Sequence, residues 1–306
     1  MALQTPLFLC GPTAVGKSEI ALLLAERIGG EIISVDSMQV YRGLDIGTAK
    51  PSSADRARVP HHLIDVVDVA EPFDAAQFVR LAQKAVTEIQ LRQRVPILCG
   101  GTGLYFKAFL QGLGESPPAD EKLRSVLEAM PLENLLRELK ESDPATYEKI
   151  DRKNPRRVIR AIEVIRLTGK TFSEQRADWR HSPLATRHSP LFFGLRRSNS
   201  DLHARINVRV DEMFRRGLVA EAGQLLKRGL AQNKIAMQAL GYRQVIEHLR
   251  GERPLAETIE LVKIRTRQFA KRQMTWFRGQ MQPNWQNIEA TDSAEVIADK
   301  IAKALL

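Results

Sequence analysis

The 306-residue chain has few of the residues that mark special classes of protein. It contains two cysteines, Cys10 and Cys99, and each closes an apolar run just before a glycine. This placement suits a small buried side chain better than a disulfide, so we expect a reducing, cytoplasmic compartment. No run approaches the ~18 consecutive apolar residues of a membrane helix, and we expect no contact with a membrane. Residues 1–6 lack a basic stretch, so we expect no cleavable signal.

Acidic residues are scarce in two segments of the chain. The sequence has 46 Lys and Arg against 36 Asp and Glu, a formal net charge of +10. Residues 152–209 hold fourteen basic and four acidic residues and so account for the whole excess, and residues 263–278 add six basic residues and no acidic one. Clustered arginine predicts a polyanionic partner such as a nucleic acid. A basic surface that merely keeps the protein soluble is the alternative interpretation.

The first hundred residues alternate between short apolar runs and longer amphipathic stretches. Apolar runs at 7–10, 31–35 and 95–99 predict buried strands, and apolar residues at helical spacing predict helices over 17–28 and 74–94. This alternation is typical of a parallel sheet covered by helices. We therefore predict a doubly wound α/β core.

The character of the chain changes after Gly112. The run Glu115-Ser116-Pro117-Pro118 breaks the pattern, and the following segment is helical, arginine-rich and short of strand signals. A strand at 191–195 and long helices between 200 and 278 then return to the core. We predict that residues 1–114 and 190–306 form the core and that residues 115–189 are a mostly helical insertion.

A phosphate-binding motif follows the first predicted strand. Residues 11–18 fit G-x-x-x-x-G-K-[ST] and open a predicted helix, where backbone amides and the helix dipole face an anion. Lys17 would neutralise terminal phosphate oxygens, and Ser18 would hold a Mg²⁺ ion that bridges two phosphates. The motif by itself predicts a diphosphate or triphosphate ligand. The predicted phosphate-binding residues are Gly11, Pro12, Thr13, Ala14, Val15, Gly16, Lys17 and Ser18.

Two more polar segments follow predicted strands, and we expect them at the carboxyl ends of neighbouring strands, where open α/β sheets place their sites. One begins with Asp36, and a carboxylate there serves either as a general base or as an outer ligand of magnesium. The residues alone leave both roles open. The other is Gly100-Gly101-Thr102, which lacks the acid expected of an ATPase metal site and so disfavours ATP hydrolysis. Its glycines let a substrate approach the backbone, where Thr102 offers a donor and an acceptor.

Two other functions are compatible with part of this pattern. A small-molecule or nucleotide kinase explains residues 11–18 but leaves both basic segments without a role. A non-catalytic RNA-binding protein explains the charge but leaves Asp36, beside a magnesium-ready loop, unexplained.

Six motifs run in order along almost the whole chain: GPTAVGKS (11–18), DSMQVYRGLDIGTAKP (36–51), GGTGLY (100–105), NPRRVIRAIEV (154–164), GYRQ (241–244) and KRQMTWFR (271–278). In these motifs the chain closely resembles the tRNA dimethylallyltransferase family, also called tRNA isopentenyltransferases, in its bacterial form. The resemblance implies a P-loop NTPase-like parallel sheet core with a helical insertion that grips the anticodon stem-loop of tRNA. It also implies transfer of a dimethylallyl group from dimethylallyl diphosphate to the exocyclic amine of adenosine 37, which gives N6-isopentenyladenosine and free diphosphate.

The resemblance assigns Mg²⁺ as cofactor and dimethylallyl diphosphate as co-substrate. Lys17, the magnesium ion and an arginine of residues 203–209 would stabilise the leaving diphosphate. Arg205 and Arg209 share a helix face, and the motif favours Arg209, with Arg205 as the second choice. Asp36 is the candidate base that accepts the amine proton. The predicted catalytic residues are Asp36, Thr102, Lys17 and Arg209.

The target base must leave its stack to reach such a crevice, which a single-stranded loop allows. For Trp276 and Phe277 two roles are equally compatible with the sequence: stacking on nucleotides, or packing in the core beneath the helix. Gln238 stands where family members commonly have arginine, so no phosphate contact is carried over to Gln238.

We expect the protein to be a monomer. The predicted tRNA-facing residues are Asp36, Ser37, Met38, Gln39, Thr102, Arg124, Pro155, Arg156, Arg157, Val158, Ile159, Gly241, Tyr242, Arg243, Lys271, Arg272, Gln273, Met274, Thr275, Trp276, Phe277 and Arg278.

Overall fold

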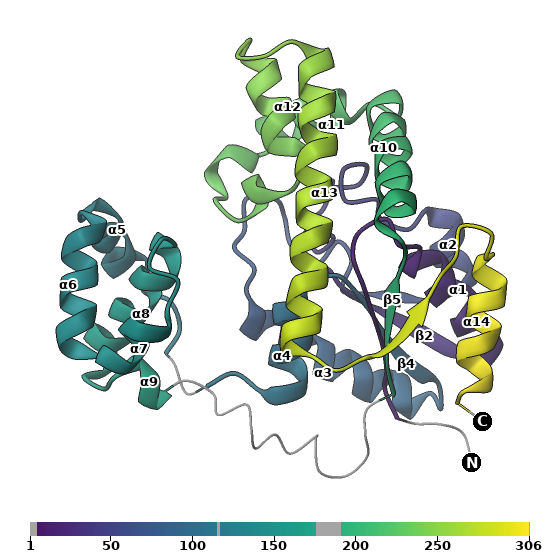
Figure 1. Ribbon diagram of the computed structural model, residues 1–306, viewed down its shortest axis with the longest axis horizontal. Coiled ribbons are helices and arrows are strands. Elements are labelled where there is room, and N and C mark those ends of the chain that lie inside the picture. The colour runs from purple at the N-terminus through teal and green to yellow at the C-terminus, as the bar shows by residue number, and fades with distance from the viewer. Residues whose placement is uncertain (1–4, 115–116, 176–190, 306) are drawn as a thin grey trace. The chain divides into compact units, whose positions relative to one another are not determined.

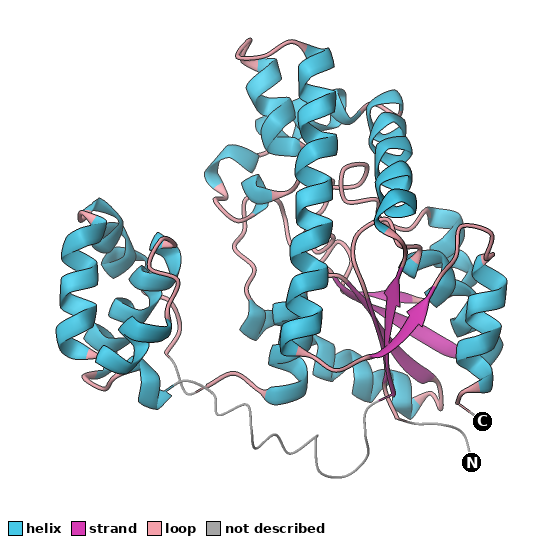
Figure 2. Ribbon diagram, in the orientation of Figure 1, coloured by secondary structure: helices cyan, strands magenta, loops and turns pink. Residues whose placement is uncertain are grey.

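The computed structural model describes residues 5–114, 117–175 and 191–305, and its strands form one sheet in which every pair is parallel (Figure 2). The strand order is β3-β2-β4-β1-β5-β6. The prediction of a parallel α/β core is therefore confirmed. The strands are β1 (Leu7–Cys10), β2 (Gly30–Val35), β3 (His61–His62), β4 (Val95–Gly100), β5 (Leu191–Arg196) and β6 (Asn284–Asn287).

The central strands are buried on both faces, which is why they read as continuous apolar runs rather than as alternating ones. Along β1, Leu7 and Leu9 pack into a core shared with α1 (Lys17–Ile28) and α14 (Ala294–Lys303). Phe8 points to the opposite face and meets Phe106 of α4 (Gly103–Gln111). The period of two along a strand thus distributes one strand between two helical layers.

The strand order separates the predicted site strands. The phosphate-binding segment follows β1, and β4, which precedes Thr102, is the direct neighbour of β1. The strand that precedes Asp36 is β2, which pairs with β4 and lies one strand further from β1. The two strands that precede Asp36 and Thr102 are therefore direct neighbours, as expected, and β4 lies between β2 and β1. All three segments still leave the same edge of the sheet, because every strand is parallel.

Further helices complete the part of the chain that holds the sheet. Figure 1 shows α10, α11 and α12 grouped at the end toward which the strands point, with α13 running from there along the sheet. No described helix is both long and apolar enough to cross a membrane. These helices are α2 (Ser53–Arg58), α3 (Ala75–Leu91), α10 (Asn199–Arg215), α11 (Leu218–Lys227), α12 (Tyr242–Leu249) and α13 (Leu255–Gln280), with short 3-10 turns η2 (Leu230–Gln232) and η3 (Ala236–Gln238).

The chain divides into two compact units, residues 1–109 with 187–306 and residues 110–186. The second unit is helical and has its own hydrophobic core, in which Leu127, Leu135, Leu139, Val158, Ala161 and Ile162 are buried. A mostly helical insertion is confirmed by this architecture, and the bounds 115–189 stay a prediction. The helices are α5 (Glu121–Ala129), α6 (Leu132–Ser142), α7 (Pro144–Lys149), α8 (Pro155–Thr168) and α9 (Phe172–Gln175).

A buried carboxylate ties the second unit together. Glu163 of α8 has a side chain with 0% exposure, and it forms ion pairs with Arg124 at 2.9 Å and Arg160 at 2.6 Å. The backbone N–H of Asp120 also donates to it at 2.9 Å. Burial acts to raise the pKa of Glu163, but the arginine hydrogen bonds outweigh this and hold the pKa below its ordinary value. Arg124, predicted to face tRNA, thus has a structural partner.

Replacing Arg124 by alanine is expected to lower the local free energy of unfolding around α8 by about 1–3 kcal/mol, because a buried carboxylate loses one charged partner. Hydrogen exchange of the α8 amides in the full-length chain measures this. A depressed pKa stabilises the fold above the ordinary value of 4.5, so the effect should shrink as the pH falls through the lowered pKa of Glu163.

Arg137→Ala, at an exposed position of α6, is the matched control and should leave α8 exchange unchanged. Unchanged exchange in Arg124→Ala together with weaker tRNA binding would assign Arg124 to the tRNA surface instead.

Candidate active site at the carboxyl edge of the sheet

The phosphate-binding segment forms a tight loop between β1 and α1. Ala14 and Gly16 adopt left-handed backbone conformations, with φ of 64° and 107°. Such alternation turns successive amides toward one centre, as in anion-binding nests. Gly11 approaches β5 so closely that a Cβ there would lie 2.7 Å from the Leu195 carbonyl oxygen. The loop is therefore a preformed anion cradle, and the structure brings residues 11–18 together around it.

Lys17 lies within this loop, and its Nζ donates to the Pro12 carbonyl oxygen at 2.6 Å. The pKa of Lys17 is lowered to about 8, mainly by burial and in part by the charge of Arg209, whereas the charge of Asp36 acts in the opposite direction. Burial likewise lowers the pKa of Arg209, against the charge of Asp36. Three predicted residues from α1, α10 and the segment after β2 thus form one electrostatic cluster.

Asp36 has one carboxylate oxygen engaged and one open. Its Oδ1 accepts hydrogen bonds from the backbone N–H of Met38 at 2.8 Å and of Gln39 at 3.3 Å. Such a local turn fixes the side chain without a partner elsewhere. Among the described residues, none donates a hydrogen bond to Oδ2. This oxygen is therefore able to accept a proton from a bound substrate.

Thr102 is hydrogen-bonded to the Asp36 segment. Its Oγ1 accepts from the backbone N–H of Ser37 at 3.1 Å, and its own N–H donates to the Val35 carbonyl oxygen at 3.1 Å. The hydroxyl reaches Ser37 Oγ only at 3.5 Å, so its hydrogen can turn to another acceptor. The structure thus joins two of the predicted catalytic residues through one hydrogen-bonded turn.

The two arginines of α10 have different surroundings. Arg205 is exposed, and its Nε donates to the Ala14 carbonyl oxygen at 2.9 Å. Arg209 is half-buried and shares the electrostatic field of Asp36. Arg205 thus holds the loop, and the preference for Arg209 as the diphosphate ligand stays a prediction.

Sequence reasoning missed a third arginine. Arg197 is almost fully buried and donates from Nε to the Val15 carbonyl oxygen at 2.9 Å, while Asp201 pairs with it at 2.8 Å. It braces the phosphate loop beside Arg205. The available signal was its position directly after a predicted strand, because such positions fall at the active edge of a parallel sheet.

Several residues predicted to face tRNA are engaged inside the protein. Gln39 is buried, with its Oε1 accepting from Ser34 Oγ at 2.8 Å and its Nε2 donating to the Thr48 carbonyl oxygen at 3.2 Å. Tyr242 is buried too, and its hydroxyl donates to Glu221 at 2.5 Å and accepts from the Gly47 N–H at 3.1 Å. Gly241 begins α12 ahead of it, and Arg243 is exposed and pairs with Glu247 at 3.1 Å.

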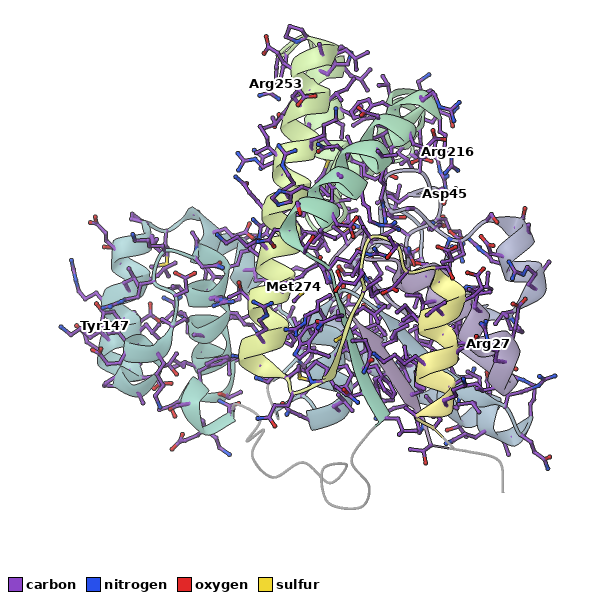
Figure 3. All side chains as sticks on the ribbon, turned by 45° about the vertical axis from the view of Figure 1, so that its right-hand side comes forward. Arg27, Asp45, Tyr147, Arg216, Arg253 and Met274 are labelled. Carbon is purple, nitrogen blue, oxygen red and sulfur yellow. The ribbon has the colours of Figure 1, made fainter. Side chains whose placement is uncertain are left out.

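Helix α13 presents one polar face and one buried face. Lys271, Arg272, Thr275 and Arg278 are exposed, whereas Gln273 and Phe277 are buried. Met274, labelled on α13 in Figure 3, is half-buried. Phe277 packs against Phe106 at a ring-centroid distance of 6.0 Å and is therefore helix core.

Trp276 is half-buried and lines a shallow groove of about 650 Å³ with Lys271, Arg272 and Thr275. Its ring contributes an aromatic surface to a basic groove, so stacking on a nucleotide stays open for this residue. The lining of this groove holds two basic residues and no acidic one.

In the second unit, the predicted residues lie in the first turns of α8. Pro155, Arg156 and Arg157 are exposed, and neither arginine forms an ion pair within the described parts of the chain. Ile159 is half-buried, and Val158 is fully buried in the core of that unit. Val158 is therefore wrong as a surface residue, because helix periodicity turns it inward.

The donor set around the loop has the chemistry of a phosphate-held magnesium site. No group of three or more His, Cys, Asp or Glu suited to a metal occurs among residues 5–114, 117–175 and 191–305. Magnesium, however, is commonly held by one or two protein oxygens together with substrate phosphates. Ser18, exposed in the first turn of α1, and the open oxygen of Asp36 are oxygen donors of this kind.

Comparisons with known proteins agree over almost the whole chain. The family model described as "IPP transferase" matches residues 39–280. The chain is 43% identical over 299 residues to tRNA dimethylallyltransferase 2 of Geotalea uraniireducens (strain Rf4), covering 96% of this chain and 95% of that relative. It is 45% identical over 294 residues to tRNA dimethylallyltransferase of Desulforudis audaxviator (strain MP104C), covering 94% of each.

Solved structures show the same likeness. The tRNA isopentenylpyrophosphate transferase of Bacillus halodurans matches with a TM-score of 0.73 and 39% identity, covering 99% of this chain and 95% of that one. A eukaryotic dimethylallyltransferase described as acting on tRNA matches with a TM-score of 0.77 and 28% identity, covering 98% of this chain and 77% of that one.

Proposed function

Because this chain belongs to the IPP transferase family, we infer that it is an enzyme that transfers a dimethylallyl group from dimethylallyl diphosphate to an adenosine of tRNA. We further propose that the acceptor is the exocyclic amine of adenosine 37 in the anticodon stem-loop, so that N6-isopentenyladenosine forms. The observation that carries the proposal is the cluster of Lys17, Arg209 and Asp36, which sets two cations at an anion cradle and one carboxylate beside them.

The cations of this cluster match the charge that the reaction creates. As the amine nitrogen bonds to the allylic carbon, the bond from that carbon to the diphosphate oxygen breaks and its electron pair leaves with the diphosphate. Lys17, Arg209 and the loop amides are already placed before the reaction, so they stabilise this charge without reorganisation. Lys17 is partly desolvated, which strengthens its interaction with a bound anion.

The carboxylate matches the proton that the reaction releases. Attack by the amine leaves an extra proton on nitrogen, and we assign its removal to Asp36 Oδ2, the oxygen outside the local turn. Thr102 is hydrogen-bonded to the same turn, and its hydroxyl hydrogen stays available to orient the adenine of the tRNA. A general base of this kind contributes about 10²- to 10⁴-fold to the rate.

Magnesium fits the oxygen donors at this edge of the sheet. We propose that Ser18 and the substrate phosphates would hold the ion. When bound, Mg²⁺ would supply further neutralisation of the leaving diphosphate.

Two exposed basic surfaces support a tRNA ligand. One is the polar face of α13 with Lys271, Arg272 and Arg278, and the other is the start of α8 with Arg156 and Arg157. Unpaired arginines suit phosphate recognition because each offers a planar set of donors. Action as a monomer in the cytoplasm stays a prediction.

Arg156→Ala and Arg157→Ala are each expected to weaken tRNA binding and to reduce the slope of log K against log salt by roughly 0.7–0.9, because each removes one phosphate contact. Filter binding at several salt concentrations measures the slope. Arg137→Ala is the control for loss of an exposed arginine in the same unit. A slope equal to wild type in both α8 variants would remove this surface from the interface.

A substrate assay tests the function itself. The protein is incubated with unmodified tRNA and either labelled dimethylallyl diphosphate or γ-labelled ATP. Prenylated adenosine, absent from a transcript with guanosine at position 37, is the expected product. A phosphorylated product would make the protein a kinase, and tRNA binding without any transfer would make it a non-catalytic RNA-binding protein.

A further inference from the structure

One side chain of α13 connects the two loops that would hold the two substrates. Gln273 is 8% exposed, although its neighbours Lys271 and Arg272 are exposed. Its Oε1 accepts from the Thr13 backbone N–H at 2.8 Å, and its Nε2 donates to the Gly101 carbonyl oxygen at 2.9 Å. A single carboxamide thus spans the phosphate loop after β1 and the loop after β4.

The approach of α13 to the second loop is close enough to require glycine at two positions. A Cβ on Gly101 would lie 2.3 Å from Gln273 Nε2, and a Cβ on Gly103 would lie 2.1 Å from Trp276 Cε3. No side-chain atom sits that close to a Cβ in ordinary packing, so a larger residue displaces the Gln273 carboxamide at position 101 and the Trp276 ring at position 103. The helix is therefore fixed against residues 101–103 by contacts on either side of Thr102.

The hydrogen bonds continue from Gln273 to the carboxylate. Gly101 precedes Thr102, Thr102 Oγ1 accepts from the Ser37 N–H, and Ser37 follows Asp36. On the other side, Thr13 belongs to the cradle that also contains Lys17. Beyond the paired ends of β1 and β4, Gln273 thus connects the cradle with the segment that carries the base.

We propose that Gln273 is a positioning residue, which sets the distance between the diphosphate cradle and the Asp36–Thr102 pair so that amine and allylic carbon meet in line. The proposal rests on the proposed function. It moves Gln273 from the tRNA-facing residues to the interior of the active site. A misplacement of about 1 Å between reacting groups lowers the rate by about 10²-fold, whereas binding of either substrate alone is little affected.

The first test exploits the two opposite hydrogen bonds. In Gln273→Glu the ionised side chain still accepts from the Thr13 N–H but sets an anionic oxygen against the Gly101 carbonyl oxygen. The protonated side chain donates to that oxygen and restores both bonds. We expect kcat to fall by about 10- to 100-fold at about pH 8 and to recover toward the wild-type value as the pH falls toward about 6. KM for tRNA should stay near the wild-type value throughout.

Two further variants keep the test decisive. Gln273→Met has similar size but makes neither bond, so its kcat should fall by a similar factor at every pH. Gly101→Ala displaces the same carboxamide, and its effect should not add to that of Gln273→Met in a double-mutant cycle. Gln83→Glu, at an exposed position of α3, is the control for the substitution itself. Circular dichroism and thermal melting show that each variant is folded.

The outcomes separate this inference from the proposed function. Wild type that fails to prenylate tRNA overturns the proposed function itself. If wild type is active and the folded Gln273→Met variant has the same kcat, the positioning role of Gln273 is overturned. If the variant instead has a raised KM for tRNA and an unchanged kcat, Gln273 is a tRNA contact, and the positioning role is overturned as well.

Discussion

Asp36→Asn is expected to lower kcat by about 10²- to 10⁴-fold while leaving the Kd for tRNA nearly unchanged. The amide keeps an oxygen at the Oδ1 position, so the hydrogen bonds from Met38 and Gln39 and the local turn survive. What is lost is an oxygen basic enough to accept the amine proton. Single-turnover transfer of labelled dimethylallyl groups and a separate tRNA binding assay measure the two quantities.

A matched control is available in the same unit. Asp74 caps α3 by accepting from the Gln77 N–H at 2.9 Å, a contact that asparagine also makes. Asp74→Asn should therefore retain full turnover and binding. Equal loss of tRNA affinity and turnover in Asp36→Asn would make Asp36 a structural residue of its loop rather than the base.

The parts of the site that follow from local sequence could be predicted. The phosphate loop is one contiguous motif between a strand and a helix, so its position and its amide cradle follow directly. Asp36 and Thr102 each end a buried strand, and parallel strands bring such ends to one edge. The separation of β1 from β2 by β4 could not be predicted, because pairing between strands depends on the whole sheet.

The predictions that the structure contradicts lie in motifs read as uninterrupted blocks. A helix turns about 100° per residue, so residues 271–278 cannot present eight consecutive side chains to one tRNA ligand. The buried positions Ala270, Gln273 and Phe277 recur at intervals of three and four. This periodicity was present in the sequence, and applied to Val158 it also indicates the core.

The sequence could not decide between Arg205 and Arg209 for a different reason. A spacing of four places both on one helix face but does not show which one reaches the crevice. Strand β6 is also without a clear sequence signal, because Asn284–Asn287 is polar and short. Its partner is β5, which supplies the pairing that its own residues do not indicate.

Lys17→Met is the second variant with a large expected effect, a fall of about 10²- to 10³-fold in kcat/KM for dimethylallyl diphosphate, since it removes one preorganised charge at the leaving group. Methionine keeps the approximate length and the apolar stem of the lysine side chain, so the loop should fold. KM for tRNA should change little. Lys84→Met, at an exposed position of α3, controls for loss of a lysine, and an unchanged kcat/KM in Lys17→Met would place the leaving group elsewhere.

The lowered pKa of Lys17 gives this role a signature that does not depend on turnover. With a pKa of about 8, Lys17 loses its proton as the pH rises through that value, so the contribution of Lys17 to the affinity for inorganic diphosphate should weaken above it. A bound anion favours the charged form, so binding at about pH 8 should take up roughly half a proton through Lys17. Calorimetry in two buffers of different ionisation enthalpy, compared with Lys17→Met, measures this uptake. Equal proton uptake in wild type and variant would show that Lys17 does not face the diphosphate.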